Sequence, residues 1–172
     1  MSDTTGRGRE IYVTGLRNQH AVENQAIGLL ERQVGRLEDH PEMADRMRRH
    51  IGESREQARR LETLLSELGT SHSVVKDTVL SVAGNLATML HMPAPDEVLK
   101  STFASFAFEH YEIAAYKSLL TLADIAGHKG ATSLLGRSLA EEEAMALWIR
   151  DHLEETTLRF VNRSGEGLKA GV

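Results

Sequence analysis

The sequence predicts an all-α protein, an antiparallel four-helix bundle with a helical crossover between the second and third long helices. Long stretches rich in Leu, Ala, Glu and Arg, with only three prolines and 5% aromatic residues, favour helices over strands. Apolar residues also recur at steps of three and four along four long segments, which is the spacing of one helix face. Breaks near residues 38–41 and 127–130 would join these segments into two hairpins.

Length, composition and charge limit the class of protein. A chain of 172 residues with 41% hydrophobic residues suits a single domain, expected over residues 9–162 with flexible termini at 1–8 and 163–172. The net charge is −5 and basic residues alternate with acids, so nucleic acid is not an expected partner. The absence of cysteine excludes disulfides and thiolate chemistry. No signal peptide or membrane span is recognisable, so we expect a cytoplasmic protein without a membrane partner.

The first two long helices are expected over residues 9–37 and 42–68. In the first, a heptad pattern runs without a break, and its third member is Glu23. Pro41 disfavours helix at His40 and suits the first turn of a following helix, so a tight helical hairpin is expected here. The pattern of the first helix consists of Leu16, His20, Glu23, Ile27, Leu30, Val34 and Leu37.

The second helix differs from an ordinary bundle helix in the middle of its inward stripe. This stripe is apolar at both ends but polar at its centre, where His50, Ser54 and Gln57 stand in line. Glu53 flanks the polar centre, three residues after His50. Residues 70–95 then hold an amphipathic helix and a proline-containing loop, which we interpret as the crossover.

The last two long helices are expected over about 95–126 and 131–162. In the third, the stretch FAFEHYEIAAY places Glu109 on the same face as its apolar neighbours, with Glu112 one turn on beside that stripe. In the fourth, Glu142 is central in an apolar stripe. A carboxylate in such a stripe loses hydration worth several kcal/mol, so a cation, a proton or a dense hydrogen-bond network must compensate it.

Each long helix thus offers one carboxylate in or beside its inward stripe, and the four are Glu23, Glu53, Glu109 and Glu142. In an antiparallel hairpin, residues at the same depth lie symmetrically about the turn. The midpoints of the first and second pairs fall at residue 38 and between residues 125 and 126, at or near the expected turns. Packing would therefore bring these carboxylates, with His50 and Glu112, into one interior region. That is the constellation of a carboxylate-bridged dimetal site in a helix bundle.

The same residues resemble a known family. The segment EHYEIAAYKSLLTLA, followed by LLGRSLAEEE, looks like the YciE/YciF-like family of bacterial ferritin-like stress proteins. VENQ at residues 22–25 resembles that family's AE-x-Q, and His50, Glu53, Gln57 and Leu61 match its His, Glu, Gln, Leu pattern. The resemblance covers most of residues 10–160. It implies a ferritin-like bundle with a helical crossover, a role in stress response and a homodimer, which surface left over on the amphipathic helices also favours.

The resemblance also implies a site for two metal ions, with iron favoured and manganese next, but names no catalytic residue. One departure bears on the metal, since the wider ferritin-like pattern has Glu-x-x-His on two helices. Here Glu56 and Met145 stand where those histidines would be. An oxygen-rich site should hold Fe or Mn less tightly and admit Mg or Ca in crystals. The expected ligands are Glu23, Glu53, Glu109, Glu112, Glu142 and His50, with Gln57 and Tyr116 contacting them.

Other interpretations stay open for single residues. A glutamate in one helix stripe is more often paired with Arg or reaches solvent than binds a metal. His50 is equally a candidate for a hydrogen-bonded core histidine. Tyr116 suits core packing with its hydroxyl bonded to a carboxylate. Glu56 points away from the stripe and is expected on a solvated face.

Two hypotheses for the function follow. The first is a metal-binding protein that oxidises Fe(II) or handles peroxide at a dinuclear centre, with its status as an enzyme left open. The second is a non-catalytic stress or assembly protein whose polar belt fixes the helix register. Chelation separates the two, because removing an integral metal would leave like charges crowded and lower the melting temperature.

Overall fold

The computed structural model describes residues 2–37, 39–71 and 96–166. They form four helices that pack as a bundle, which confirms the predicted all-α class. The crossover predicted between the second and third long helices lies, from residue 72 to residue 95, outside the described residues. The helices are α1 (Ser2–Val34), α2 (Pro41–Glu67), α4 (Glu97–Ile125) and α5 (Ala131–Gly165).

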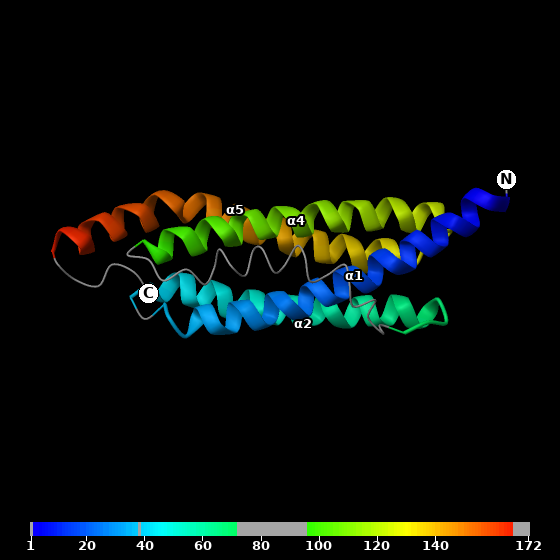
Figure 1. Ribbon diagram of the computed structural model, residues 1–172, viewed down its shortest axis with the longest axis horizontal. Helices are drawn as coiled ribbons and strands as arrows, with labels where there is room; N and C mark the ends of the chain where they lie inside the picture. Colours follow the sequence, from blue (N-terminus) through cyan, green and yellow to red (C-terminus); the bar gives the residue numbers. More distant parts are fainter. Residues whose placement is uncertain (1, 38, 72–95, 167–172) are drawn as a thin grey trace.

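The bundle consists of two antiparallel hairpins that lie side by side (Figure 1). α1 packs along α2, and α4 packs along α5, while α1 also contacts α4 and α2 contacts α5. Each helix therefore has two helix neighbours, and the inward faces surround one central axis. None of the described helices combines the length and apolar character that a membrane crossing needs.

The helix ends follow the chemistry of the turn residues. Pro41 opens α2, where its missing N–H removes no intrahelical hydrogen bond. Gly69 and Gly127 follow α2 and α4 with φ of 70° and 71°, a left-handed conformation that costs glycine little. The second of these turns leads directly into α5.

The core is two apolar clusters with a polar layer between them. One cluster includes Tyr12, Leu61 and Leu135 and lies towards the α4–α5 turn. The other includes Met47 and Ile149 and lies towards the α1–α2 turn. Between them are buried polar side chains that we call the polar belt: Glu23, His50, Gln57, Glu109, Glu112 and Glu142.

Two details differ from the sequence prediction. α1 begins at Ser2, seven residues before the predicted start at Arg9. Its first turns pack closely on the end of α4, since a Cβ at Gly8 would lie 2.6 Å from Cγ2 of Ile125.

The second difference concerns the inward stripe of α4. Phe106 and Ile113 are only partly buried, whereas Glu112, predicted beside the stripe, is fully buried within it. α4 is apolar on more than one face, so its hydrophobic spacing alone did not fix which face points inward. The rotation of α4 brings both Glu109 and Glu112 into the polar belt.

Candidate metal centre

Four glutamate side chains meet in the middle of the bundle. Glu23 comes from α1, Glu109 and Glu112 from α4, and Glu142 from α5, and none is more than 1% exposed. All four were predicted as metal ligands. Because a buried carboxylate is costly to desolvate, its neighbours decide whether it holds a proton, a hydrogen bond or a cation.

His50 of α2 lies among these carboxyl groups and is itself 1% exposed. Its Nε2 is 3.1 Å from Oε2 of Glu109 and 3.6 Å from Oε2 of Glu142. Ligand atoms of the three residues lie within 4.8 Å of one another, close enough to hold a metal ion. Within the described ranges, this is the one group of three or more acidic or histidine ligands that meets this criterion.

The part of the belt between α1 and α4 is stabilised by neutral donors. Nε2 of Gln19 donates to Oε1 of Glu23 at 3.0 Å and to Oε1 of Glu112 at 3.1 Å. The hydroxyl of Tyr116 donates to the same Oε1 of Glu23 at 2.5 Å. We call these four residues the α1/α4 half of the belt.

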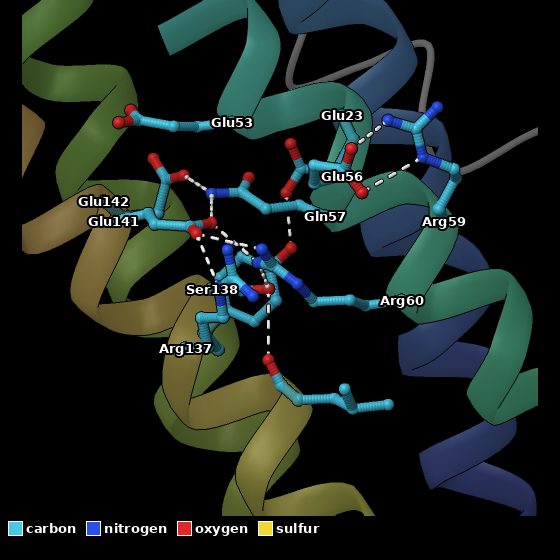
Figure 2. A network of polar contacts seen from close by, with 12 residues as sticks. Glu23, Glu53, Glu56, Gln57, Arg59, Arg60, Arg137, Ser138, Glu141 and Glu142 are labelled. Atoms are coloured by element: carbon cyan, nitrogen blue, oxygen red, sulfur yellow. Dashed lines mark hydrogen bonds and ion pairs between the residues drawn. The ribbon is translucent and has the colours of Figure 1, made fainter. Parts of the chain in front are cut away.

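The part between α2 and α5 contains a permanent cation (Figure 2). Nε2 of Gln57 donates to Oε1 of Glu142 at 2.5 Å and to Oε2 of Glu141 at 3.1 Å. Arg60 donates to both carboxylate oxygens of Glu141, at 2.6 and 2.9 Å, and to Oγ of Ser138 at 3.0 Å. We call these five residues the α2/α5 half.

Glu53, also predicted as a ligand, is not brought to the other carboxyl groups. Its side chain is 32% exposed, and its Oε2 lies 2.9 Å from Nδ1 of His50 and 3.0 Å from Nη1 of Arg46. In this position Glu53 fixes the ring of His50 and leaves Nε2 facing the belt. Histidines that bind metals commonly have such a carboxylate on the opposite ring nitrogen.

Burial raises the pKa of three belt carboxyl groups, those of Glu23, Glu112 and Glu142. For Glu23 the pKa rises to about 7, although hydrogen bonds from Tyr116 and Gln19 act against the rise. Burial, with the charges of Glu23, Glu142 and Glu109, holds the pKa of Glu112 well above its usual range. Burial and neighbouring Glu109 do the same to the pKa of Glu142, against the opposing charge of His50.

The pKa of His50, the basic residue of the belt, is also raised. Burial lowers the pKa of His50, but the nearby carboxylates of Glu109, Glu53 and Glu142 outweigh it and hold that pKa well above normal. The hydrogen bond from His50, with help from Arg46, lowers the pKa of Glu53 to about 2 against the effect of burial. Without a metal, the belt therefore retains protons on carboxyl groups and on the imidazole near neutral pH.

Three belt carboxyl groups each have one buried oxygen, Oε2, that receives no hydrogen bond from an N–H or O–H group of the described residues. Buried polar atoms nearly always have partners, so three such atoms in one region call for an explanation. Carboxylate oxygens are ligands that hard cations prefer, and an imidazole nitrogen suits iron. The residues present therefore fit a metal. These atoms belong to Glu23, Glu112 and Glu142, whereas Oε2 of Glu109 lies 3.1 Å from Nε2 of His50.

Several residues of this network were not singled out from the sequence, among them Gln19, Arg60, Ser138 and Glu141. Gln19 lies four residues before Glu23, so it shares the inward face of α1 and its amide could have been noticed. Arg60 lies three residues after Gln57 and so continues the polar stripe of α2. Glu141 had no such signal, because it points to one side of its helix and becomes partly buried through Arg60.

These features define a class of protein, a four-helix bundle with buried carboxyl groups and a histidine at its centre. The chain belongs to the family described as "Domain of unknown function (DUF892)", which it matches over residues 7–162. The relatives below confirm the resemblance to YciF-like proteins that the sequence motifs predicted.

The relatives match over nearly their whole length. "Protein YciF" of Escherichia coli (strain K12) is 23% identical over 162 residues, covering 91% of this chain and 94% of that protein. A crystal structure of a protein from Xanthomonas campestris pv. campestris has a TM-score of 0.78 at 28% identity, covering 92% of this chain and 99% of that one. The crystal structure of the E. coli stress protein YciF has a TM-score of 0.73 at 21% identity, covering 85% and 94%. These structures share the four-helix fold.

Proposed function

We propose that this is a ferritin-like, stress-related protein that holds two metal ions in its polar belt, with iron favoured and manganese next, and that it oxidises Fe(II) or handles peroxide there. The observation that best supports this function is the set of buried carboxyl oxygens without hydrogen bonds around His50. A purely structural network would be expected to pair those oxygens.

The proposed ligands form two groups. His50, Glu109 and Glu142 would hold one ion, because their ligand atoms already lie together. Glu23 and Glu112 would extend the site towards α1 and α4. Glu53 serves here as the residue that orients His50 instead of as a direct ligand.

Bound iron would supply Fe(II)/Fe(III) redox chemistry. The chain itself supplies the environment. The two apolar clusters on either side of the belt exclude bulk water, and Gln19 and Tyr116 orient the Glu23 carboxyl group. Nε2 of His50 must lose its proton before it can bind a cation, so metal binding should release protons.

The test is metal analysis of the wild-type protein and of Glu109→Ala, purified without chelator and supplied with Fe(II) or Mn(II). We expect the wild type to bind metal and to melt at a higher temperature when metal is added. Glu109→Ala should lose half or all of the bound metal, together with the metal-dependent rise in melting temperature.

Glu143→Ala is the matched control. Glu143 follows Glu142 directly on α5, but it is exposed and pairs with Lys117 at the surface. This variant should bind metal as the wild type does. Equal metal content in Glu109→Ala and Glu143→Ala would refute the proposed site.

The alternative function, a non-catalytic stress or assembly protein, has its own supporting observation. In the α2/α5 half, Arg60, Glu141 and Gln57 form a connected network that needs no metal. If the whole belt were such a network, neither a chelator nor added metal would change the melting temperature.

We also propose that the protein acts in the cytoplasm as a homodimer. Exposed apolar side chains on α4 and α5, among them Phe103, Tyr111, Leu147 and Leu158, provide surface that a second copy would cover. Sedimentation at micromolar concentration tests the dimer, and a pure monomer there would contradict it.

A further inference from the structure

A small cavity lies where the start of α2 meets the second half of α5, and its lining residues are six or more residues away from the belt residues of the same helices. Its volume is about 20 Å³, enough for one water-sized species. His40 and Met43 line it from the N-terminal end of α2, and Trp148 and His152 line it from α5. The spacings of three and four residues put each pair on one helix face.

His40 carries the first observation that points to a ligand. The residue is 3% exposed, and its Nε2 is buried without a hydrogen-bond partner. Burial, with Arg159 and Arg163 nearby, lowers the pKa of His40, so the ring is neutral at physiological pH. A neutral imidazole can offer a lone pair to a metal.

His152 is held in the state that a metal ligand needs. Its Nδ1 donates a hydrogen bond to the backbone carbonyl of Trp148 at 2.8 Å, so Nε2 of the neutral ring keeps its lone pair. The indole of Trp148 stacks on the same ring, with centroids 4.1 Å apart and planes inclined by 20°. A histidine whose other ring N–H is bound to a carbonyl is the common arrangement around protein-bound metals.

The third donor decides the type of metal. Met43 is buried and lines the cavity, and its side chain carries a thioether sulfur. Among the described residues, no three His, Asp or Glu ligand atoms come together here, so a hard cation lacks its usual ligands. Thioether and imidazole ligands instead select soft ions such as Cu(I).

The charged residues around the cavity are consistent with the binding of one monovalent cation. Glu42, Glu155 and Arg159 also line it, and Arg159 lies 3.7 Å from Glu155. This pair is neutral overall, so Glu42 remains to balance one monovalent cation. We propose that His40, Met43 and His152 form a second metal site, separate from the belt, that binds one soft monovalent cation, Cu(I), or Ag(I) as its redox-inert analogue.

Binding can be followed by the fluorescence of Trp148, because it is the only tryptophan of the chain and stacks on a proposed ligand, His152. We expect titration of the full-length protein with Ag(I), and with Cu(I) under anaerobic conditions, to change its fluorescence and to saturate at one equivalent. Met43→Leu keeps the volume but removes the sulfur, and should weaken binding about tenfold or more. His152→Gln, at a half-exposed position, tests a second ligand with little risk to folding and should weaken binding likewise.

Two matched variants separate this site from the core and from the belt. Met47→Leu changes a buried methionine one turn further along α2, which does not line the cavity, and should bind Ag(I) as the wild type does. Glu109→Gln should also leave Ag(I) binding unchanged, whatever it does to Fe(II) or Mn(II). No saturable change in the wild type, or equal affinity in Met43→Leu and Met47→Leu, would overturn the proposal.

Discussion

The two halves of the polar belt compensate their buried carboxyl groups in different ways. Both bury carboxyl groups between a pair of helices, but only the α2/α5 half contains an arginine, Arg60, which is paired with Glu141 through two hydrogen bonds. In the α1/α4 half, Glu23 and Glu112 receive hydrogen bonds only from neutral groups, Gln19 and Tyr116.

This difference distinguishes a charge pair that is always present from carboxyl groups whose charge changes with pH or with metal binding. A guanidinium stays charged at every accessible pH, so the Arg60 pair is permanent. Glu23 and Glu112 have no such partner, and burial raises the pKa of both, so that protons neutralise them near pH 7. Protons can be exchanged for metal ions, whereas Arg60 cannot leave. The charge of both carboxyl groups in the α1/α4 half therefore depends on conditions, whereas in the α2/α5 half this holds for Glu142, whose pKa burial also raises, but not for the pair of Arg60 and Glu141.

The largest effect is expected from removing the permanent cation. Arg60→Met keeps the length of the side chain but leaves the partly buried Glu141 without its main partner. Glu141 would keep only the exposed Arg137 as a charged partner, with Nε of Arg137 3.2 Å from its Oε1, so the free energy of unfolding should fall by about 3 kcal/mol, the lower end for a broken buried ion pair. Urea denaturation of the metal-free protein measures this change.

Arg59→Met is the control for that experiment. Arg59 is the preceding residue of α2, and its ion pair with Glu56 is exposed at the surface. Loss of this exposed pair should change the free energy of unfolding far less than loss of Arg60 does, because solvent screens both charges. Equal losses in the two variants would mean that the α2/α5 half gains nothing from its buried position.

A pH series on Glu23→Gln tests the other half. In the folded protein the pKa of Glu23 is raised to about 7 from its usual 4.5, so the native state holds the proton more tightly than the unfolded chain. The stability from this group is full below pH 4.5 and is lost as the pH rises through 7. Gln stays neutral, so in metal-free protein the variant should gain about 3 kcal/mol over the wild type by pH 8.

At pH 4.5 the same two proteins should differ little, because both side chains are then neutral. Glu143→Gln, at the exposed position on α5, should follow the wild type throughout. If Glu23→Gln showed no pH-dependent advantage, Glu23 would be ionised with a partner other than those in the α1/α4 half.

How much of this could be read from the sequence depends on the kind of feature. The four helices and both hairpins follow from apolar periodicity and from Pro41, Gly69 and Gly127, which are local signals. Glu23, Glu109 and Glu142 could be located because each interrupts an otherwise apolar stripe. Such an interruption is visible without knowledge of the partner helix.

Features that depend on the neighbouring helix were harder to predict. α4 is apolar on several sides, so the choice of Glu109 over Glu112 as the central residue could not be made from spacing alone, and the structure buries both. The role of Glu53 depends on His50, which takes the inward position and leaves Glu53 at the edge of the belt. Tertiary packing determined both outcomes, and a periodic pattern carries no information about it.

The smallest expected effect comes from Tyr116→Phe, which removes one neutral donor from the α1/α4 half and keeps the ring in the core. Glu23 retains its hydrogen bond from Gln19, so the loss should be about 1 kcal/mol in metal-free protein. Because the Tyr116 hydrogen bond lowers the pKa of Glu23, the variant should also hold the Glu23 proton to higher pH. Tyr111→Phe, at a 40% exposed position on the same helix, controls for loss of a hydroxyl alone. A titration of carbon-13-labelled carboxyl groups measures the shift, and an unchanged Glu23 titration in Tyr116→Phe would show that neutral donors do not govern the protonation of this half.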